Sequence, residues 1–126
     1  MLSHLLDLSG AKEQKMVHVG DLLAGISDVS GAELFETVAT IAGVRIERIV
    51  SQGQSTAAGE WYDQAWHEWV LLVKGEALLL IEGEQAPHRL LPGQWMLLPA
   101  HCRHRVEWTL PDQETIWLAL HGPERS

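Results

Sequence analysis

The chain has 126 residues, of which 46% are hydrophobic and 21% charged, and its 17 acidic and 9 basic residues give a formal net charge of −8. This length corresponds to one domain, and the composition is that of a globular protein rather than a disordered or fibrous one. The negative charge repels phosphate backbones and anionic lipids, so we expect neither nucleic acid nor a membrane as a partner.

Two further features limit the class of protein. The single cysteine, Cys102, excludes an internal disulfide and a cysteine cluster around zinc. No apolar run approaches the ~20 residues that span a bilayer. The first fifteen residues lack the basic start and long apolar stretch of a signal peptide. We therefore expect a cytoplasmic protein.

The N-terminal third predicts an extension, residues 1–40, that packs on a barrel domain of residues 41–126. Residues 1–15 have the pattern of a loose or weakly helical tail. Residues 30–38 carry apolar side chains at helical spacing, with Ser30 as a candidate N-cap. These features predict one short helical segment before the barrel.

After Gly43 the pattern changes to short strands separated by glycine and proline turns, such as Lys74-Gly75-Glu76 and Pro92-Gly93. Strands at roughly 8–12-residue spacing with almost no helix indicate an antiparallel sandwich or barrel. The predicted strands cover residues 44–51, 68–73, 77–82, 88–91, 95–98, 103–109 and 115–121.

Two stretches of this region resemble the paired motifs of the cupin superfamily. Gly59–Gly75 resembles the first motif, a Gly followed by His-x-His, a Glu and a Gly, and Pro92–Val106 resembles the second, which ends on a His. The resemblance covers about residues 44–121. It implies an all-β jelly-roll barrel, often dimeric, that in many members holds one metal ion among three His and one Glu. Some members are oxygenases, isomerases, epimerases or decarboxylases, and others bind ligands without catalysis.

The departures from the motifs concern the metal ligands. Tyr62 and Gln64, within Tyr62-Asp63-Gln64, stand where the first motif has its two histidines. Glu68 and His104 keep the places of two ligands, while His101 replaces a glycine of the second motif. By position, the resemblance therefore implies that two of the usual four ligands survive.

Side chains alternate along a strand, so Tyr62, Gln64, Trp66 and Glu68 would share one face if no bulge intervenes. The resemblance implies that this face points into the barrel. Tyr62, Gln64 and Trp66 are thus candidate pocket residues, together with Arg105 for an acidic ligand. The alternative is that the tryptophan ring only fills the barrel.

Glu68, His101 and His104, with Gln64 or water as a fourth ligand, could hold one divalent transition metal such as Zn, Fe, Mn or Ni. Each has an alternative role. His104 could simply hydrogen-bond Glu68 inside the protein, and His101 could be a turn residue, because histidine tolerates left-handed backbone angles. Cys102 could be a ligand or an inert small residue.

Two functions follow as hypotheses. The first is a metal-binding cupin that acts on or binds a small organic molecule in the barrel. The second is a non-catalytic ligand-binding or regulatory cupin without metal, which the loss of His-x-His favours. We also expect a homodimer, because exposed strands can pair across an edge or pack face to face.

Overall fold

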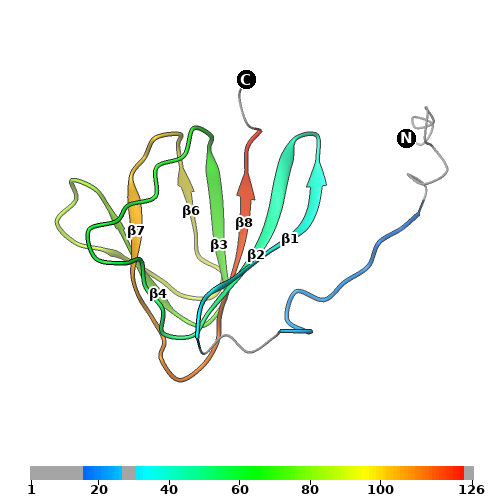
Figure 1. Cartoon of the computed structure of the whole chain (residues 1–126), viewed down its shortest axis with the longest axis horizontal. Coiled ribbons are helices and arrows are strands. Elements are labelled where there is room, and N and C mark those ends of the chain that lie inside the picture. The colour runs from blue at the N-terminus through cyan, green and yellow to red at the C-terminus, as the bar shows by residue number, and fades with distance from the viewer. Residues whose placement is uncertain (1–15, 27–30, 124–126) are drawn as a thin grey trace.

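The computed structural model describes residues 16–26 and 31–123 (Figure 1). In this part of the chain the fold is all-β, which confirms the predicted fold class. Its eight strands are β1 (Leu34–Ile41), β2 (Val44–Ser51), β3 (Glu68–Lys74), β4 (Ala77–Ile81), β5 (His88–Leu90), β6 (Trp95–Leu98), β7 (His104–Thr109) and β8 (Thr115–His121). No helix among the described residues is long and apolar enough to cross a lipid bilayer.

The strands form two antiparallel sheets that enclose the interior of a jelly roll. The larger sheet has the order β1-β2-β8-β3-β6, and the smaller has the order β5-β4-β7. Figure 1 shows β4 and β7 on the side of the molecule opposite β1 and β2, with β3, β6 and β8 between them. The last strand, β8, thus lies in the middle of the larger sheet, between the early strands β2 and β3.

The helix expected over residues 30–38 was wrong where the structure describes this stretch, because Leu34–Ile41 is strand β1. Its β-branched side chains fit a pleated sheet better than a helix. The strand pairs along its length with β2, from Leu34 opposite Val50 to Ile41 opposite Val44. The candidate cap Ser30 and the predicted tail of residues 1–15 lie outside the described residues.

The core lies between the two sheets and follows from the two-residue alternation of the strands. In β3, Glu68, Val70 and Leu72 are buried, while Trp69 and Leu71 are only half-buried on the opposite face. The main hydrophobic cluster combines residues of both sheets, namely Val70, Leu72, Ala77, Leu79, Leu90, Leu98 and Trp117. This packing fills one end of the barrel and leaves polar side chains at the other.

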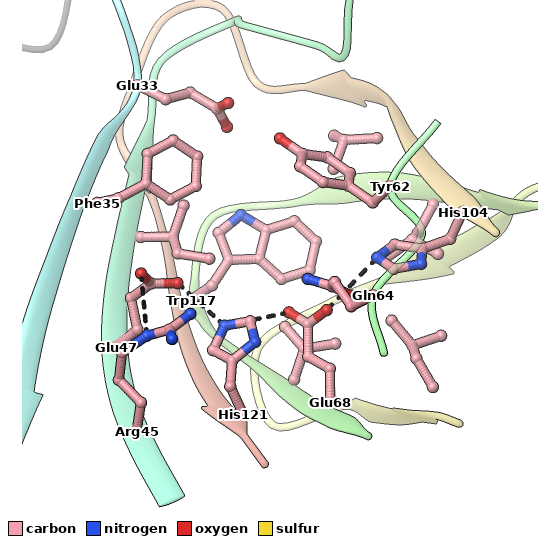
Figure 2. Close-up of a pocket in the computed structure, with 15 residues that line it drawn as sticks. Glu33, Phe35, Arg45, Glu47, Tyr62, Gln64, Glu68, His104, Trp117 and His121 are labelled. Carbon is pink, nitrogen blue, oxygen red and sulfur yellow. Dashed lines mark hydrogen bonds and ion pairs between the residues drawn. The ribbon is translucent and has the colours of Figure 1, made fainter. Parts of the chain in front are cut away.

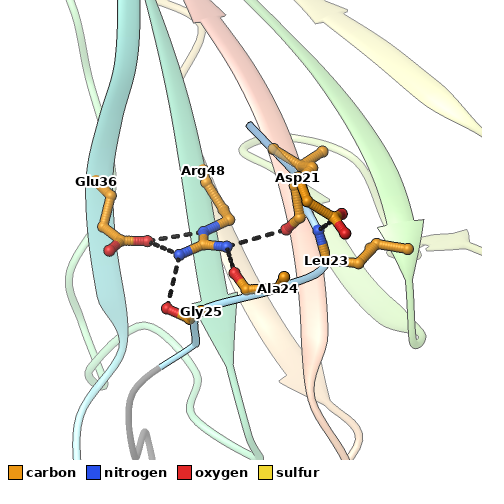
Figure 3. A network of polar contacts seen from close by, with 7 residues as sticks. Asp21, Leu23, Ala24, Gly25, Glu36 and Arg48 are labelled. Atoms are coloured by element: carbon orange, nitrogen blue, oxygen red, sulfur yellow. Dashed lines mark hydrogen bonds and ion pairs between the residues drawn. The ribbon is translucent and has the colours of Figure 1, made fainter. Parts of the chain in front are cut away.

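The segment before β1 packs on the outer face of the larger sheet. Arg48, which is 8% exposed, donates hydrogen bonds to the backbone carbonyls of Leu22 at 3.0 Å and Ala24 at 2.7 Å, and it pairs with the Glu36 carboxylate (Figure 3). Nearby, Ile26 packs against the buried side chains of Val50 and Ile116. A guanidinium with carbonyl and carboxylate partners is thus the polar centre of this contact.

Candidate functional site

The polar end of the barrel contains a pocket with a volume of about 230 Å³ (Figure 2). Strand alternation explains its lining. Strand β2 contributes Arg45, Glu47 and Ile49, which are two residues apart. Strand β8 contributes Trp117 and His121, which are four residues apart. The remaining lining residues are Glu33, Phe35, Tyr62, Gln64, Glu68, Val70, Leu79, Leu98, His104 and Val106.

Glu68 and His104 form a buried pair in this pocket, one from each sheet. Their residues are 7% and 5% exposed, and the distance from His104 Nε2 to Glu68 Oε1 is 3.4 Å. His104 Nδ1 lies 2.8 Å from the Cys102 carbonyl and must donate to it, because a carbonyl only accepts. The other ring nitrogen, Nε2, is therefore the atom that faces the carboxylate.

The pKa of His104 is raised above its usual value of 6.5. Burial acts in the opposite direction and lowers this pKa, but the Glu68 carboxylate and the Cys102 carbonyl both favour the imidazolium and outweigh burial, with a smaller contribution from Asp63. His104 is accordingly poised to carry a proton beside a carboxylate.

A second imidazole, His121, approaches the other oxygen of Glu68. Its Nε2 lies 3.8 Å from Glu68 Oε2 and 3.0 Å from Glu47 Oε1. The indole of Trp66 donates to His121 Nδ1 at 3.0 Å, so Nδ1 accepts and Nε2 carries the hydrogen. Trp66 therefore fixes the tautomer of His121 and aims its Nε2–H at the two carboxylates.

One oxygen of Glu68 lacks a hydrogen bond. Among the buried side-chain atoms of the described residues, Glu68 Oε1 is the one without a hydrogen-bond partner, although His104 is within ion-pair distance. A buried carboxylate oxygen in this condition is costly unless something in the pocket satisfies it. This atom points to the place where a bound molecule would be held.

Tyr62 closes the pocket above His104. Its ring stacks on the imidazole with 5.5 Å between ring centroids, and antiparallel backbone bonds link the two residues. Burial raises the pKa of the Tyr62 hydroxyl, and the carboxylates of Glu33, Glu68, Glu60 and Glu47 raise it further. The tyrosine hydroxyl therefore stays protonated in a negative electrostatic environment.

The structure brings Tyr62, Gln64, Glu68 and His104 together around the pocket, but it does not bring His101 there. His101 is exposed in a left-handed turn with φ of 64°, and its Nδ1 lies 2.9 Å from Asp63 Oδ1. A carboxylate partner outside the barrel and the turn backbone hold the imidazole at the surface.

Trp66 and Arg105 stand outside the pocket lining. Trp66 acts one step away through His121. Arg105 donates to the backbone carbonyls of the loop before Tyr62, at Thr56, Ala57 and Glu60, and to the Glu107 carboxylate. Residues 63–67 are not a strand, so the alternation expected to place Trp66 beside Gln64 does not apply to them.

Cys102 packs against the hydrophobic core cluster. Burial raises the pKa of its thiol, and Glu84 adds to this effect. A thiol that stays protonated is neither a good nucleophile nor a good metal ligand.

Sequence reasoning missed His121, Glu47 and Glu33. His121 could have been found by counting in steps of two from Trp117 along its strand. Glu47 could have been found in the same way, because it lies two residues from both Arg45 and Ile49 along its strand. Their convergence with Glu68, however, depends on strand β8 lying between β2 and β3, which no local pattern reveals.

The donors in this pocket do not match the metal site that the cupin resemblance implies. His104 and His121 approach different oxygens of Glu68, and both nitrogens of His121 already have partners. Within the described ranges, no three His, Cys, Asp or Glu side chains are arranged to hold a metal ion. One imidazole and one carboxylate are fewer donors than a resident transition metal normally has.

Solved structures are similar to this chain along most of its length. A protein from Ralstonia eutropha JMP134, described provisionally as a mannose-6-phosphate isomerase, is 43% identical over 83% of this chain and 97% of its own, with a TM-score of 0.80. An RmlC-like cupin from Desulfovibrio desulfuricans is 16% identical over 87% of this chain and 100% of its own, with a TM-score of 0.71.

A third structure, an RmlC-like cupin with a double-stranded β-helix fold from Methanocaldococcus jannaschii, is 17% identical over 79% of this chain and 88% of its own, with a TM-score of 0.62. No protein-family model and no curated protein matches the chain. The two distant similarities concern the fold alone. Together with the architecture, they show that the chain has the cupin-type jelly-roll fold.

Proposed function

We propose that this protein binds a small polar organic molecule in the barrel pocket, with Glu68 and His104 as its polar anchor and without a resident metal ion. The observation that carries the proposal is Glu68 Oε1, a buried carboxylate oxygen that lacks a hydrogen-bond partner among the described residues and faces the pocket beside His104. A hydroxyl or ammonium hydrogen of a bound molecule would satisfy it.

The chemistry that fits this pair is proton transfer. A carboxylate with a free lone pair can accept a proton, and an adjacent imidazolium can donate one. Isomerisation of a sugar moves a proton between neighbouring carbons, so the description of the Ralstonia protein supports the same reaction class. The alternative function, ligand binding without catalysis, uses the same residues but moves no proton.

The metal-bound form expected from the sequence stays a prediction. An ion held by Glu68 and His104 would need its remaining ligands from Gln64, water or the bound molecule. Elemental analysis of the purified protein tests this directly. Stoichiometric metal that disappears in Glu68→Gln would replace the metal-free proposal by a metal centre.

The experiment for the proposed function is a titration of the metal-free protein, followed by backbone NMR, with mannose, mannose 6-phosphate and choline. We expect chemical-shift changes at pocket residues with at least one of these molecules. In Glu68→Gln the dissociation constant should be about tenfold higher, because one charge-assisted hydrogen bond is lost. Glu114→Gln, a surface change at the Lys74 ion pair, should leave binding unchanged.

Deuterium transfer separates the two functions. If the bound molecule gains solvent deuterium in the wild type but not in His104→Gln, the pair moves a proton. Binding without deuterium incorporation leaves the non-catalytic module. Pocket resonances that none of the three molecules shifts would count against the proposed function.

A further inference from the structure

The outer half of the pocket combines aromatic rings with an acidic side chain. Phe35 from β1, Tyr62 from the loop before β3 and Trp117 from β8 line this half, and Figure 2 shows Glu33 beside them, with its carboxylate directed toward the same space. Phe35 is 49% and Tyr62 37% exposed, so both rings lie near the mouth, whereas Trp117 is 3% exposed and forms the floor.

The charges that line the pocket are mostly negative. Three carboxylates, those of Glu33, Glu47 and Glu68, are among its described lining residues. The cationic groups that oppose them are the guanidinium of Arg45 and, when protonated, the imidazole of His104, which is paired with Glu68. Arg45 is already engaged, since its Nε lies 3.9 Å from Glu47 Oε2 and its guanidinium carbon lies 5.9 Å from the centre of the Trp66 ring. An anionic ligand would therefore enter against a negative field.

Glu33 is held in this position by a defined contact. The hydroxyl of Ser51, which is fully buried, donates to Glu33 Oε2 at 2.6 Å. Figure 2 shows the Glu33 carboxylate directed toward the pocket. The buried Glu68 Oε1, without a hydrogen-bond partner among the described side chains, lies deeper in the same cavity.

Aromatic faces and carboxylates both attract a positive charge from which water has been removed. Building on the proposed function, we infer that the ligand of this pocket is a small organic ammonium ion, held between the rings of Phe35, Tyr62 and Trp117 and opposite the carboxylate of Glu33. Burial is the largest cause of the raised pKa of the Tyr62 hydroxyl, and the carboxylates of Glu33, Glu68, Glu60 and Glu47 raise it further.

This pocket also differs from one built for a sugar phosphate. A phosphate site normally offers guanidinium groups, lysines or backbone N–H groups at a helix start. Here the lining residues within the described chain offer Arg45 alone, and Glu47 opposes it. Mannose 6-phosphate should therefore bind more weakly than mannose.

The test compares two probes of the same shape, choline and its neutral carbon analogue 3,3-dimethyl-1-butanol, by calorimetric titration of the full chain. We expect choline to bind about tenfold more tightly, because cation–π attraction and charge attraction act on it alone. Its affinity should fall as salt is added, while that of the alcohol should not.

Two pocket variants and one control make the comparison specific. Glu33→Gln keeps an oxygen that can accept a hydrogen bond from Ser51. It should lower the affinity for choline severalfold and leave the affinity for the alcohol unchanged. Phe35→Leu, at a half-exposed position, should act in the same direction. Glu114→Gln removes a carboxylate away from the pocket lining and should change neither affinity.

Equal affinity for choline and the alcohol, or tighter binding of mannose 6-phosphate than of mannose, would overturn the ammonium inference while leaving the proposed function standing. Failure of choline to bind, together with pocket shifts caused by mannose, would have the same meaning. The proposed function itself fails if none of the probes shifts the pocket resonances.

Discussion

At the scale of single residues, the two oxygens of Glu68 have different surroundings. Oε2 faces the Nε2–H of His121, whose tautomer Trp66 fixes. Oε1 faces His104, whose second nitrogen donates to the Cys102 carbonyl. The unprotonated nitrogen of a neutral His104 therefore faces a carboxylate oxygen, whereas His121 directs a hydrogen toward the other oxygen.

This difference predicts how stability depends on pH. The pKa of His104 is raised in the folded protein, so its charged form stabilises the fold fully below its unfolded pKa near 6.5, and this contribution is lost as the pH rises through the folded value. The free energy of unfolding should therefore decline across that window. His104→Gln should remove this part of the decline.

The measurement is urea unfolding at a series of pH values for the wild type and His104→Gln. The difference in unfolding free energy between them isolates His104 from the other histidines. Glu68→Gln should lower the pKa of His104 seen by NMR titration, whereas Glu114→Gln should not. Parallel stability profiles for the wild type and His104→Gln would contradict the pairing.

At the scale of the elements, the turns and the N-terminal segment hold the strands in place. Gly75, between β3 and β4, has a positive φ of 94°, and a Cβ there would stand 2.7 Å from the Thr115 backbone. Gly83, after β4, has nearly the same φ of 93° but open space around it. One turn therefore contacts β8 closely, and the other needs only the backbone conformation.

Replacing each glycine by alanine separates strain from steric overlap. Gly83→Ala should cost about 1 kcal/mol, the penalty for a left-handed non-glycine residue. Gly75→Ala should cost at least about 3 kcal/mol, because the backbone of Thr115 must also move. Chemical denaturation of both variants measures the difference, and equal costs would show that the close approach to β8 has no energetic weight.

The contacts of Arg48 should stabilise the packing of the segment before β1. Arg48→Met keeps most of the side-chain volume but removes its bonds to the Leu22 and Ala24 carbonyls and to Glu36, and it should destabilise the fold by about 2–4 kcal/mol. Residues 16–26 should also become accessible to protease. Arg103→Met, at a half-exposed ion pair with Glu82, should cost less than about 1 kcal/mol. Equal protection of residues 16–26 in both variants would contradict this role.

At the scale of the whole molecule, the larger sheet presents an apolar outer face. Trp95 and Leu97 on its edge strand β6 are each 58% exposed. They lie opposite Leu71 and Trp69 of β3, and the rings of Trp69 and Trp95 are 5.8 Å apart. Leu118 and Leu120 continue the same face on β8. A contiguous apolar face of this kind on a folded protein commonly marks an interaction surface.

We expect a second copy of the chain to cover this face. Sedimentation velocity at micromolar concentration should give about twice the chain mass of 14.0 kDa. Leu97→Lys should shift the protein to the monomer, because a charge would be buried in the interface. Leu91→Lys, at an exposed position outside this face, should not. A single 14.0 kDa species in the wild type would contradict the dimer.

Much of the fold was predictable because strand signals are local. The predicted ranges 44–51, 95–98 and 115–121 coincide with β2, β6 and β8. The boundaries of these strands depend on side-chain alternation and Gly/Pro turns, which involve only residues close together in the sequence. The strand β1 was misjudged because its apolar spacing also fits a helix, and only its pairing with β2 decides between the two.

The site was predictable only in part. The motif spacing identified Glu68 and His104, and the structure shows them 3.4 Å apart across the two sheets. Their neighbours His121, Glu47 and Glu33 come from strands or loops far away in the chain, and sheet order brings them together. The reverse holds for His101, which is close to His104 in sequence but is turned to the surface by its left-handed backbone.

The amino-acid sequence alone thus determined the cupin class, most strand limits and two polar residues of the pocket, because these depend on the nature and spacing of nearby residues. Only the tertiary structure decided which other charged groups face that pair. It also decided that His104 and His121 approach different oxygens of Glu68. The reason is physical: convergence depends on sheet order and register, and a shift of one residue in register would turn each of these side chains to the opposite face.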